Sequence, residues 1–106
     1  MRTKTLWIKD EYLQWILDGR KTIEVRVAYS NIARLAPGDC LLLNDQYLFT
    51  IRRVGRYASF EELLASEDAG AIATDLTADQ LRSALAAIYP PEKEALGVLA
   101  LEIAPA

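Results

Sequence analysis

The chain has 106 residues, which fits a single domain, and 52% of them are hydrophobic, which argues against global disorder. Its net charge of −3 disfavours extended binding along a phosphate backbone, which needs many uncompensated Lys and Arg side chains. The absence of histidine excludes Ser-His-Asp and Cys-His catalysis, and the single cysteine excludes an internal disulfide and indicates a reducing compartment.

The chain opens with signals for a strand and then a helix. Residues 5–8 (TLWI) predict a short strand. Asp10 is placed to cap a helix whose apolar residues follow a 3–4 spacing as far as Leu17. Gly19 follows where a residue in the left-handed conformation commonly ends a helix.

The segment after this helix brings three charged residues close together. Residues 22–27 (TIEVRV) alternate strictly, so Glu24 and Arg26 share one face of the predicted strand, and the branched apolar side chains share the other. The two charged residues are either a solvated ion pair or part of a site. Strict alternation puts Lys21 on the apolar face, so it reaches Glu24 only if the chain bends at the helix–strand junction.

Three more strands are predicted. Residues 40–43 (CLLL) and about 47–54 form the arms of a hairpin, which residues 44–46 (NDQ) connect. Residues 97–103 (GVLALEI) are apolar almost throughout, which indicates a central strand.

Two helices are predicted between the hairpin and the last strand. Ser59 with Glu62, and Thr77 with Gln80, have the spacing of possible capping boxes at their starts. The prolines at 90–91 end the second helix, because proline cannot continue it. The order of elements favours a single α+β domain over residues 1–106, with the strands closed or nearly closed into a small β-barrel.

Five segments together resemble the ASCH domain family, whose members are related to the RNA-binding PUA domains. They are ILDGRKTIEVR, LAPGD, YASFEELL, AIYPPEKE and GVLALEI, and the resemblance runs from Leu6 to Ile103. It implies a small PUA-like β-barrel with flanking helices and a cleft lined by the strand that follows Lys21. Some members resemble RNA-binding modules, whereas small bacterial members are amidohydrolases that remove the acyl group from N4-acetylcytidine.

The resemblance also implies catalytic residues. The small amidohydrolases use a Lys, Thr and Glu set, in which the lysine corresponds to Lys21. The threonine position is Glu24 here, and the glutamate position aligns with Thr74, so the two residue types are exchanged. Thr22 is an alternative site threonine. In this scheme Glu24 activates water, Lys21 stabilises the oxyanion or protonates the leaving nitrogen, and Thr74 positions the water.

Other residues have both a binding and a structural interpretation. Arg26 is either the ion-pair partner of Glu24 or a substrate clamp. Tyr29, Ser30 and Asn31 are either a substrate-binding rim or turn residues. The two tryptophans, at 7 and 15, either stack on a base or, as we expect, fill the core or a groove.

Two functions therefore remain open, an amidohydrolase acting on N4-acylated cytidine and an RNA- or nucleotide-binding module without chemistry. We expect a nucleoside partner, weak RNA binding at most, no membrane, a monomer and a cytoplasmic location. We expect no cofactor and no metal, since without histidine a zinc site would have to use carboxylates and one cysteine.

Overall fold

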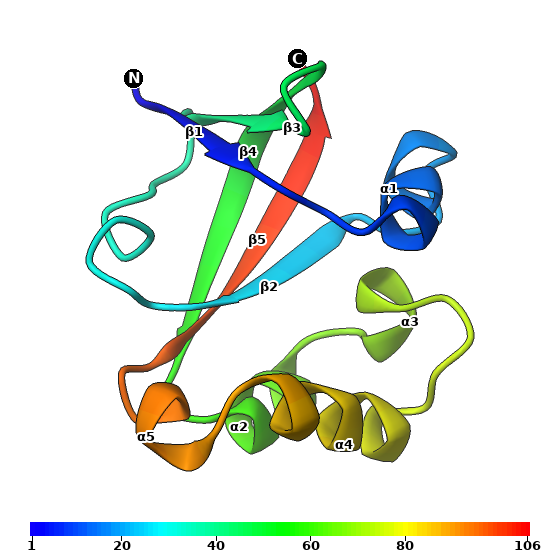
Figure 1. Cartoon of the computed structure of the whole chain (residues 1–106), viewed down its shortest axis with the longest axis vertical. Helices are drawn as coiled ribbons and strands as arrows, with labels where there is room; N and C mark the ends of the chain where they lie inside the picture. Colours follow the sequence, from blue (N-terminus) through cyan, green and yellow to red (C-terminus); the bar gives the residue numbers. More distant parts are fainter.

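The computed structural model describes all residues, 1–106, as a curled five-stranded sheet with flanking helices (Figure 1). The strands are β1 (Thr3–Leu6), β2 (Ile23–Val27), β3 (Cys40–Leu43), β4 (Tyr47–Tyr57) and β5 (Val98–Pro105). The helices are α1 (Asp10–Leu17), α2 (Phe60–Ser66), α3 (Ala69–Ile72), α4 (Ala78–Ile88) and α5 (Pro91–Glu94).

The sheet has the order β1-β3-β4-β5-β2, in which only the β1–β3 pair is parallel. This confirms the α+β fold and the internal position of β5. The sheet curls, but it stays a half-barrel rather than a closed barrel, because its two edge strands, β1 and β2, are not hydrogen-bonded to each other. One side chain crosses the opening: Arg26 Nη2 on β2 donates to the carbonyl oxygen of Trp7, just beyond β1, at 3.1 Å.

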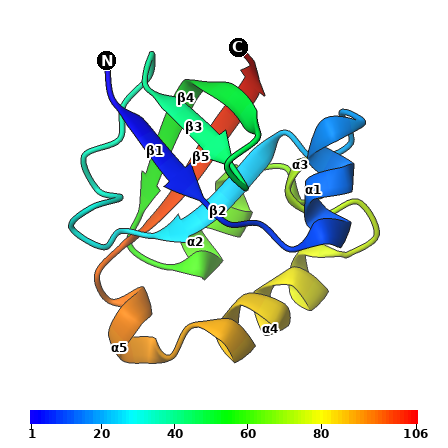
Figure 2. The ribbon, with the colours of Figure 1, turned by 45° about the horizontal axis from the view of Figure 1, so that its top comes forward.

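Apolar side chains pack on both faces of this sheet. The cluster inside the curl joins α1 and the loop after β2 to the sheet, and Leu41, Leu43 and Leu101 lie at its centre, fully buried. The cluster on the outer face joins α2 and α4 to β2 and β5, with Phe60 and Leu63 fully buried. Both termini lie at the end of the sheet away from α4 and α5 (Figures 1 and 2).

Some predicted boundaries were wrong. The first strand occupies Thr3–Leu6 rather than residues 5–8, because its parallel pairing with β3 ends at Leu43. The chain beyond it is held by Asn44, which accepts from the Ile8 N–H at 2.8 Å and donates to the Ile8 carbonyl at 2.9 Å. Trp7 therefore leaves the sheet, and it is 68% exposed rather than part of the core.

The helix ends also differ in part from expectation. Lys9, not Asp10, is the N-cap residue of α1, and Asp10 lies in the first turn. The capping box of Thr77 and Gln80 is confirmed, with both reciprocal hydrogen bonds formed. The structure adds the one-turn helices α3 and α5, whose four residues are too short for a periodic signal.

None of the helices combines the length and the apolar composition that crossing a membrane requires.

Gly19 generates the first prediction, since it makes the turn between α1 and β2 with a φ of +87°. Gly19→Ala should lower the free energy of unfolding by about 1 kcal/mol, because a Cβ disfavours this left-handed conformation. No atom lies within 4 Å of the position a Cβ would take, so the cost is conformational rather than steric. Urea denaturation followed by circular dichroism measures it.

Gly19→Asn is the matched control, because asparagine tolerates the left-handed region better than alanine. Its free energy of unfolding should lie between those of wild type and Gly19→Ala. Equal stability of the alanine and asparagine variants would contradict this account of the turn.

Candidate functional site

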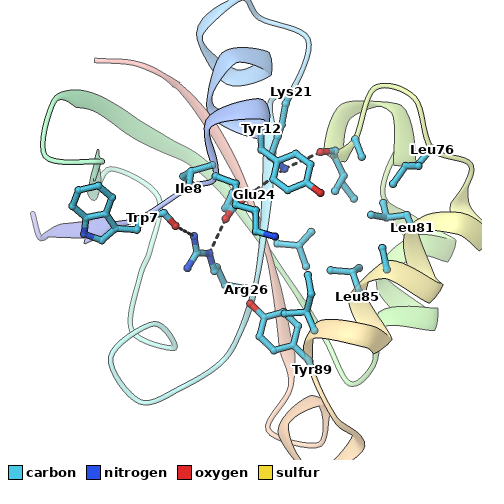
Figure 3. Close-up of a pocket in the computed structure, with 16 residues that line it drawn as sticks. Trp7, Ile8, Tyr12, Lys21, Glu24, Arg26, Leu76, Leu81, Leu85 and Tyr89 are labelled. Atoms are coloured by element: carbon cyan, nitrogen blue, oxygen red, sulfur yellow. Dashed lines mark hydrogen bonds and ion pairs between the residues drawn. The ribbon is translucent and has the colours of Figure 1, made fainter.

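A cavity of about 280 Å³ lies at the free edge of β2 (Figure 3). One wall comes from the segment after β1 and from α1, the opposite wall from α3 and α4, and β2 forms the floor between them. Most of the lining is apolar, and its charged side chains are those of Lys9, Lys21, Glu24 and Arg26. Three of these four come from the segment in which the sequence places its candidate site.

Lys21 reaches the cavity because the chain turns at Gly19 before the strand begins. Its ammonium donates to the carbonyl oxygens of Ile23 at 2.6 Å and Ile72 at 2.8 Å, and it lies 3.3 Å from Glu24 Oε1. The residue is only 5% exposed. An ammonium has three donors, so these three acceptors account for all of them.

Burial lowers the pKa of Lys21 below its ordinary value of 10.5, because removal from water disfavours the charged form. The neighbouring Glu24 carboxylate opposes this shift, and the Arg26 guanidinium adds to it. Lys21 is therefore a lysine from which a proton is removed more easily than from one at the surface.

Glu24 lies between two cations. Its Oε1 faces Lys21, and its Oε2 accepts from Arg26 Nε at 2.7 Å. Its side chain is 12% exposed, so the carboxylate still borders the cavity. The ion pair predicted between Glu24 and Arg26 is confirmed. Arg26 keeps spare donors, since its bonds to Glu24 and to the Trp7 carbonyl use two of the five N–H groups of a guanidinium.

The wall opposite these charges is apolar and comes largely from α4. Leu81, Ala84, Leu85 and Ile88 follow the helical spacing that places them on one face of α4, and this face borders the cavity. Tyr89 ends the wall, and burial raises the pKa of its hydroxyl above the ordinary value. A ligand in the cavity would thus contact charge on one side and hydrocarbon on the other.

The structure brings Lys21, Glu24 and Arg26 together but does not bring the candidate threonines into the cavity. Thr74 is not among the lining residues, although it follows Ile72 and Ala73, which are. Its Oγ1 is buried without a hydrogen-bond partner. Thr22 is exposed and also lies outside the lining. The structure therefore places neither threonine in the lining of the cavity.

Tyr29, Ser30 and Asn31 are exposed and do not line the cavity either. The loop that contains them turns toward the inside of the curl, where Ile32 and Leu35 are buried in the core. Tyr29 instead lies near α5, with Lys93 Nζ 5.8 Å from the centre of its ring. The substrate-binding rim predicted from these three residues is thus not part of the cavity in this structure.

Several lining residues were missed from the sequence. Tyr12 and Tyr89 border the cavity, and so does Val25 on the floor. The helical spacing that continues from Leu81 toward the end of α4 is a sequence signal for an apolar face, but it does not tell a cavity wall from a core.

The described chain has no group of three or more His, Cys, Asp or Glu side chains placed to hold a metal ion.

Lys21 generates the second prediction. Lys21→Met should lower the free energy of unfolding by about 2–4 kcal/mol at neutral pH, because two carbonyl oxygens and Glu24 lose a buried partner. Lys9→Met is the matched control, since Lys9 borders the same cavity but is exposed, and it should change stability by less than about 0.5 kcal/mol.

The sign of the pH dependence follows from the lowered pKa of Lys21. Between its folded and unfolded pKa values the unfolded state binds more protons, so the stability due to this residue rises with pH. The gap in unfolding free energy between wild type and Lys21→Met should therefore widen as the pH is raised toward 10.5. A gap that narrows over this interval would contradict the lowered pKa.

Comparison with known proteins places this geometry in a family. The ASCH domain family matches residues 6–106. The crystal structure of hypothetical protein PH0355 is similar over 100% of both chains, with a TM-score of 0.91 and 25% identity. The solution NMR structure of protein PF0455 from Pyrococcus furiosus covers 97% of this chain and 96% of its own, with a TM-score of 0.80 and 24% identity. No curated protein matches the chain. Because the family match spans almost every residue of this fold, the chain belongs to the ASCH domain family.

Proposed function

We propose that the protein is an amidohydrolase that removes the acyl group from N4-acylated cytosine nucleosides such as N4-acetylcytidine. The observation that supports this most is the Glu24 carboxylate, held between Lys21 and Arg26 at the border of a mostly apolar cavity. The resemblance of the segment around Lys21 to small amidohydrolases points to the same reaction.

Glu24 is the general base in this proposal. A carboxylate accepts at several lone-pair positions, so bonds to the two cations leave room for a water molecule. Glu24 takes a proton from that water as its oxygen attacks the acyl carbon. The protonated carboxyl then gives the proton to N4 as the C–N bond breaks, and the products are cytidine and a carboxylic acid.

Arg26 is better placed than Lys21 to stabilise the oxyanion. The ammonium of Lys21 already has three acceptors, whereas the guanidinium has N–H groups beyond those bonded to Glu24 and Trp7. Donors aimed at a developing negative charge are worth more in a site that excludes water. Lys21 then acts through Glu24, since its ammonium lies 3.3 Å from Oε1 and holds the carboxylate in position.

The apolar wall suits the other parts of the substrate. A pyrimidine ring and an acyl chain both gain free energy when hydrocarbon replaces water around them, at about 25 cal/mol per Å² of apolar surface buried. The cavity volume of about 280 Å³ fits part of a nucleoside, with the sugar toward the solvent.

Glu24→Gln generates the third prediction. It should lower kcat/KM for N4-acetylcytidine by about 10²–10⁴, because the amide keeps the shape but cannot accept the proton. Release of cytidine, followed by ultraviolet absorbance, measures the rate. Glu102→Gln is the matched control, because Glu102 is a glutamate on β5 that pairs with Arg53 away from the cavity.

The control should keep the wild-type rate, and thermal melts of both variants should show that they remain folded. A wild-type protein without turnover would remove the hydrolase proposal. Turnover that survives Glu24→Gln would remove Glu24 as the base.

The exposed indole of Trp7 supports a second candidate, a nucleotide- or RNA-binding module without chemistry. Trp7 is 68% exposed at the cavity border, and its ring points away from the apolar wall (Figure 3). An exposed aromatic ring can stack on a base while Lys9 and Arg26, which border the same cavity, contact phosphate. Hydrolysis is the first choice, because a buried carboxylate paired with two cations adds nothing to phosphate binding.

RNA binding generates the fourth prediction. With a net charge of −3, the chain should bind a random single-stranded RNA weakly, and the affinity should fall steeply with salt. Fluorescence anisotropy at 50 and 200 mM salt measures this. A tight complex at physiological salt, weakened by Trp7→Ala, would favour the binding module over the hydrolase.

A further inference from the structure

The open edge of β2 presents main-chain groups as well as side chains to the cavity. The antiparallel register pairs Thr22 with Ile103 and Ala28 with Gly97, and each pair has an N–H to carbonyl bond of 2.9 Å. Because such bonds recur at every second residue, the backbone groups of the even-numbered residues of β2 face β5. The backbone N–H and C=O groups of Ile23, Val25 and Val27 must therefore face the open edge.

Two of these three residues have their outward carbonyl oxygens occupied. The Ile23 carbonyl accepts from Lys21 Nζ at 2.6 Å, and the Val27 carbonyl accepts from the Tyr29 N–H at 2.8 Å. Val25 lies between them, and no protein group bonds its N–H or its carbonyl oxygen on this edge. Val25 is also a lining residue of the cavity and is only 7% exposed.

We propose that the main-chain N–H and C=O of Val25 recognise the ring edge of an N4-substituted cytosine, with the N–H donating to N3 and the C=O accepting from N4–H. This inference rests on the proposed function and specifies how that site holds its substrate. A buried polar group without a partner is costly, so a ligand that bonds both groups gains affinity from them.

The hydrogen bonds already made by the carbonyls of Ile23 and Val27 favour a small planar ring over a peptide as the ligand of this edge. A peptide strand added to a sheet edge bonds to every second residue, so it would need the carbonyls of Ile23 and Val27 as well as Val25. Lys21 and Tyr29 already use those two carbonyls. One donor and one acceptor on a single residue match a planar ring that carries an acceptor beside a donor, as N3 and N4–H of cytosine do.

This placement also suits the chemistry. Glu24 and Arg26 flank Val25 in the strand, and they carry the ion pair beside which the reaction would occur. A ring held on Val25 brings N4, and therefore the scissile amide, next to both side chains. The apolar wall of α4 then covers the ring face.

The test uses ligands that cannot be hydrolysed. N4-ethylcytidine keeps N3 and N4–H, 3-deaza-N4-ethylcytidine lacks the N3 acceptor, and N4,N4-dimethylcytidine lacks the N4–H donor. In ¹H–¹⁵N spectra of the labelled wild-type protein, N4-ethylcytidine should move the Val25 amide proton downfield and slow its exchange. The Val27 amide, on the same edge but outside the cavity lining, should not respond. Each of the other two ligands should bind roughly threefold to tenfold more weakly, because one hydrogen bond is lost.

A pair of variants provides a second measurement. Val25→Pro removes an N–H that takes no part in the sheet, which an edge strand tolerates, and it should abolish the preference for N4-ethylcytidine over the 3-deaza ligand. Val27→Pro is the matched control, because it removes the same kind of outward N–H from the same strand, and it should keep that preference. The wild-type spectra test the proposal even if neither variant folds.

Several results would overturn the inference. They are an unshifted Val25 amide in the complex, equal affinities for the three ligands, and no binding of any of them. Hydrolysis of N4-acetylcytidine, measured in parallel, separates the two proposals. Turnover without a Val25 response removes the main-chain recognition alone, whereas binding with a Val25 response but without turnover removes the hydrolase alone.

Discussion

The buried ammonium of Lys21 joins the parts of the structure that make the cavity. It bonds the free edge of β2 through Ile23, the end of α3 through Ile72, and the carboxylate of Glu24. Burying a charge is unfavourable unless it is paired and hydrogen-bonded, so all of these groups must be in place together. Burial still disfavours the charged form of Lys21, and its pKa is therefore lowered.

The incomplete closure of the sheet is the second constraint. A closed barrel would pair β1 with β2 and occupy the outward backbone groups of Val25. In the half-barrel these strands are instead bridged by Arg26, which donates to the Trp7 carbonyl and to Glu24. The opening becomes a cavity because α1 and the apolar face of α4 cover its two sides. The half-barrel therefore leaves the edge of β2 unpaired, while α1 and α4 shield that edge from other chains.

The charged segment of the site could be predicted because its causes are local. Strict alternation places Glu24 beside Arg26, and Gly19 provides the turn that Lys21 needs to join them. Thr74, by contrast, was predicted only from the alignment of the family's glutamate position, not from a local pattern. The structure leaves it outside the cavity lining, where Ile72 at the end of α3 and Ala73 just after it lie instead.

The sequence by itself determined the α+β class, the alternation of β2, the turn at Gly19 and the capping box of α4, because each depends on residues only a few positions apart. Tertiary structure decided that the sheet forms a half-barrel, that Trp7 lies outside the core, and that the Ile72 carbonyl accepts from Lys21. It also decided that Tyr29, predicted as part of a rim, lies near α5 rather than in the cavity lining. These outcomes depend on contacts between segments far apart in the chain, and no local pattern specifies which distant group will satisfy a buried charge or cover a strand edge.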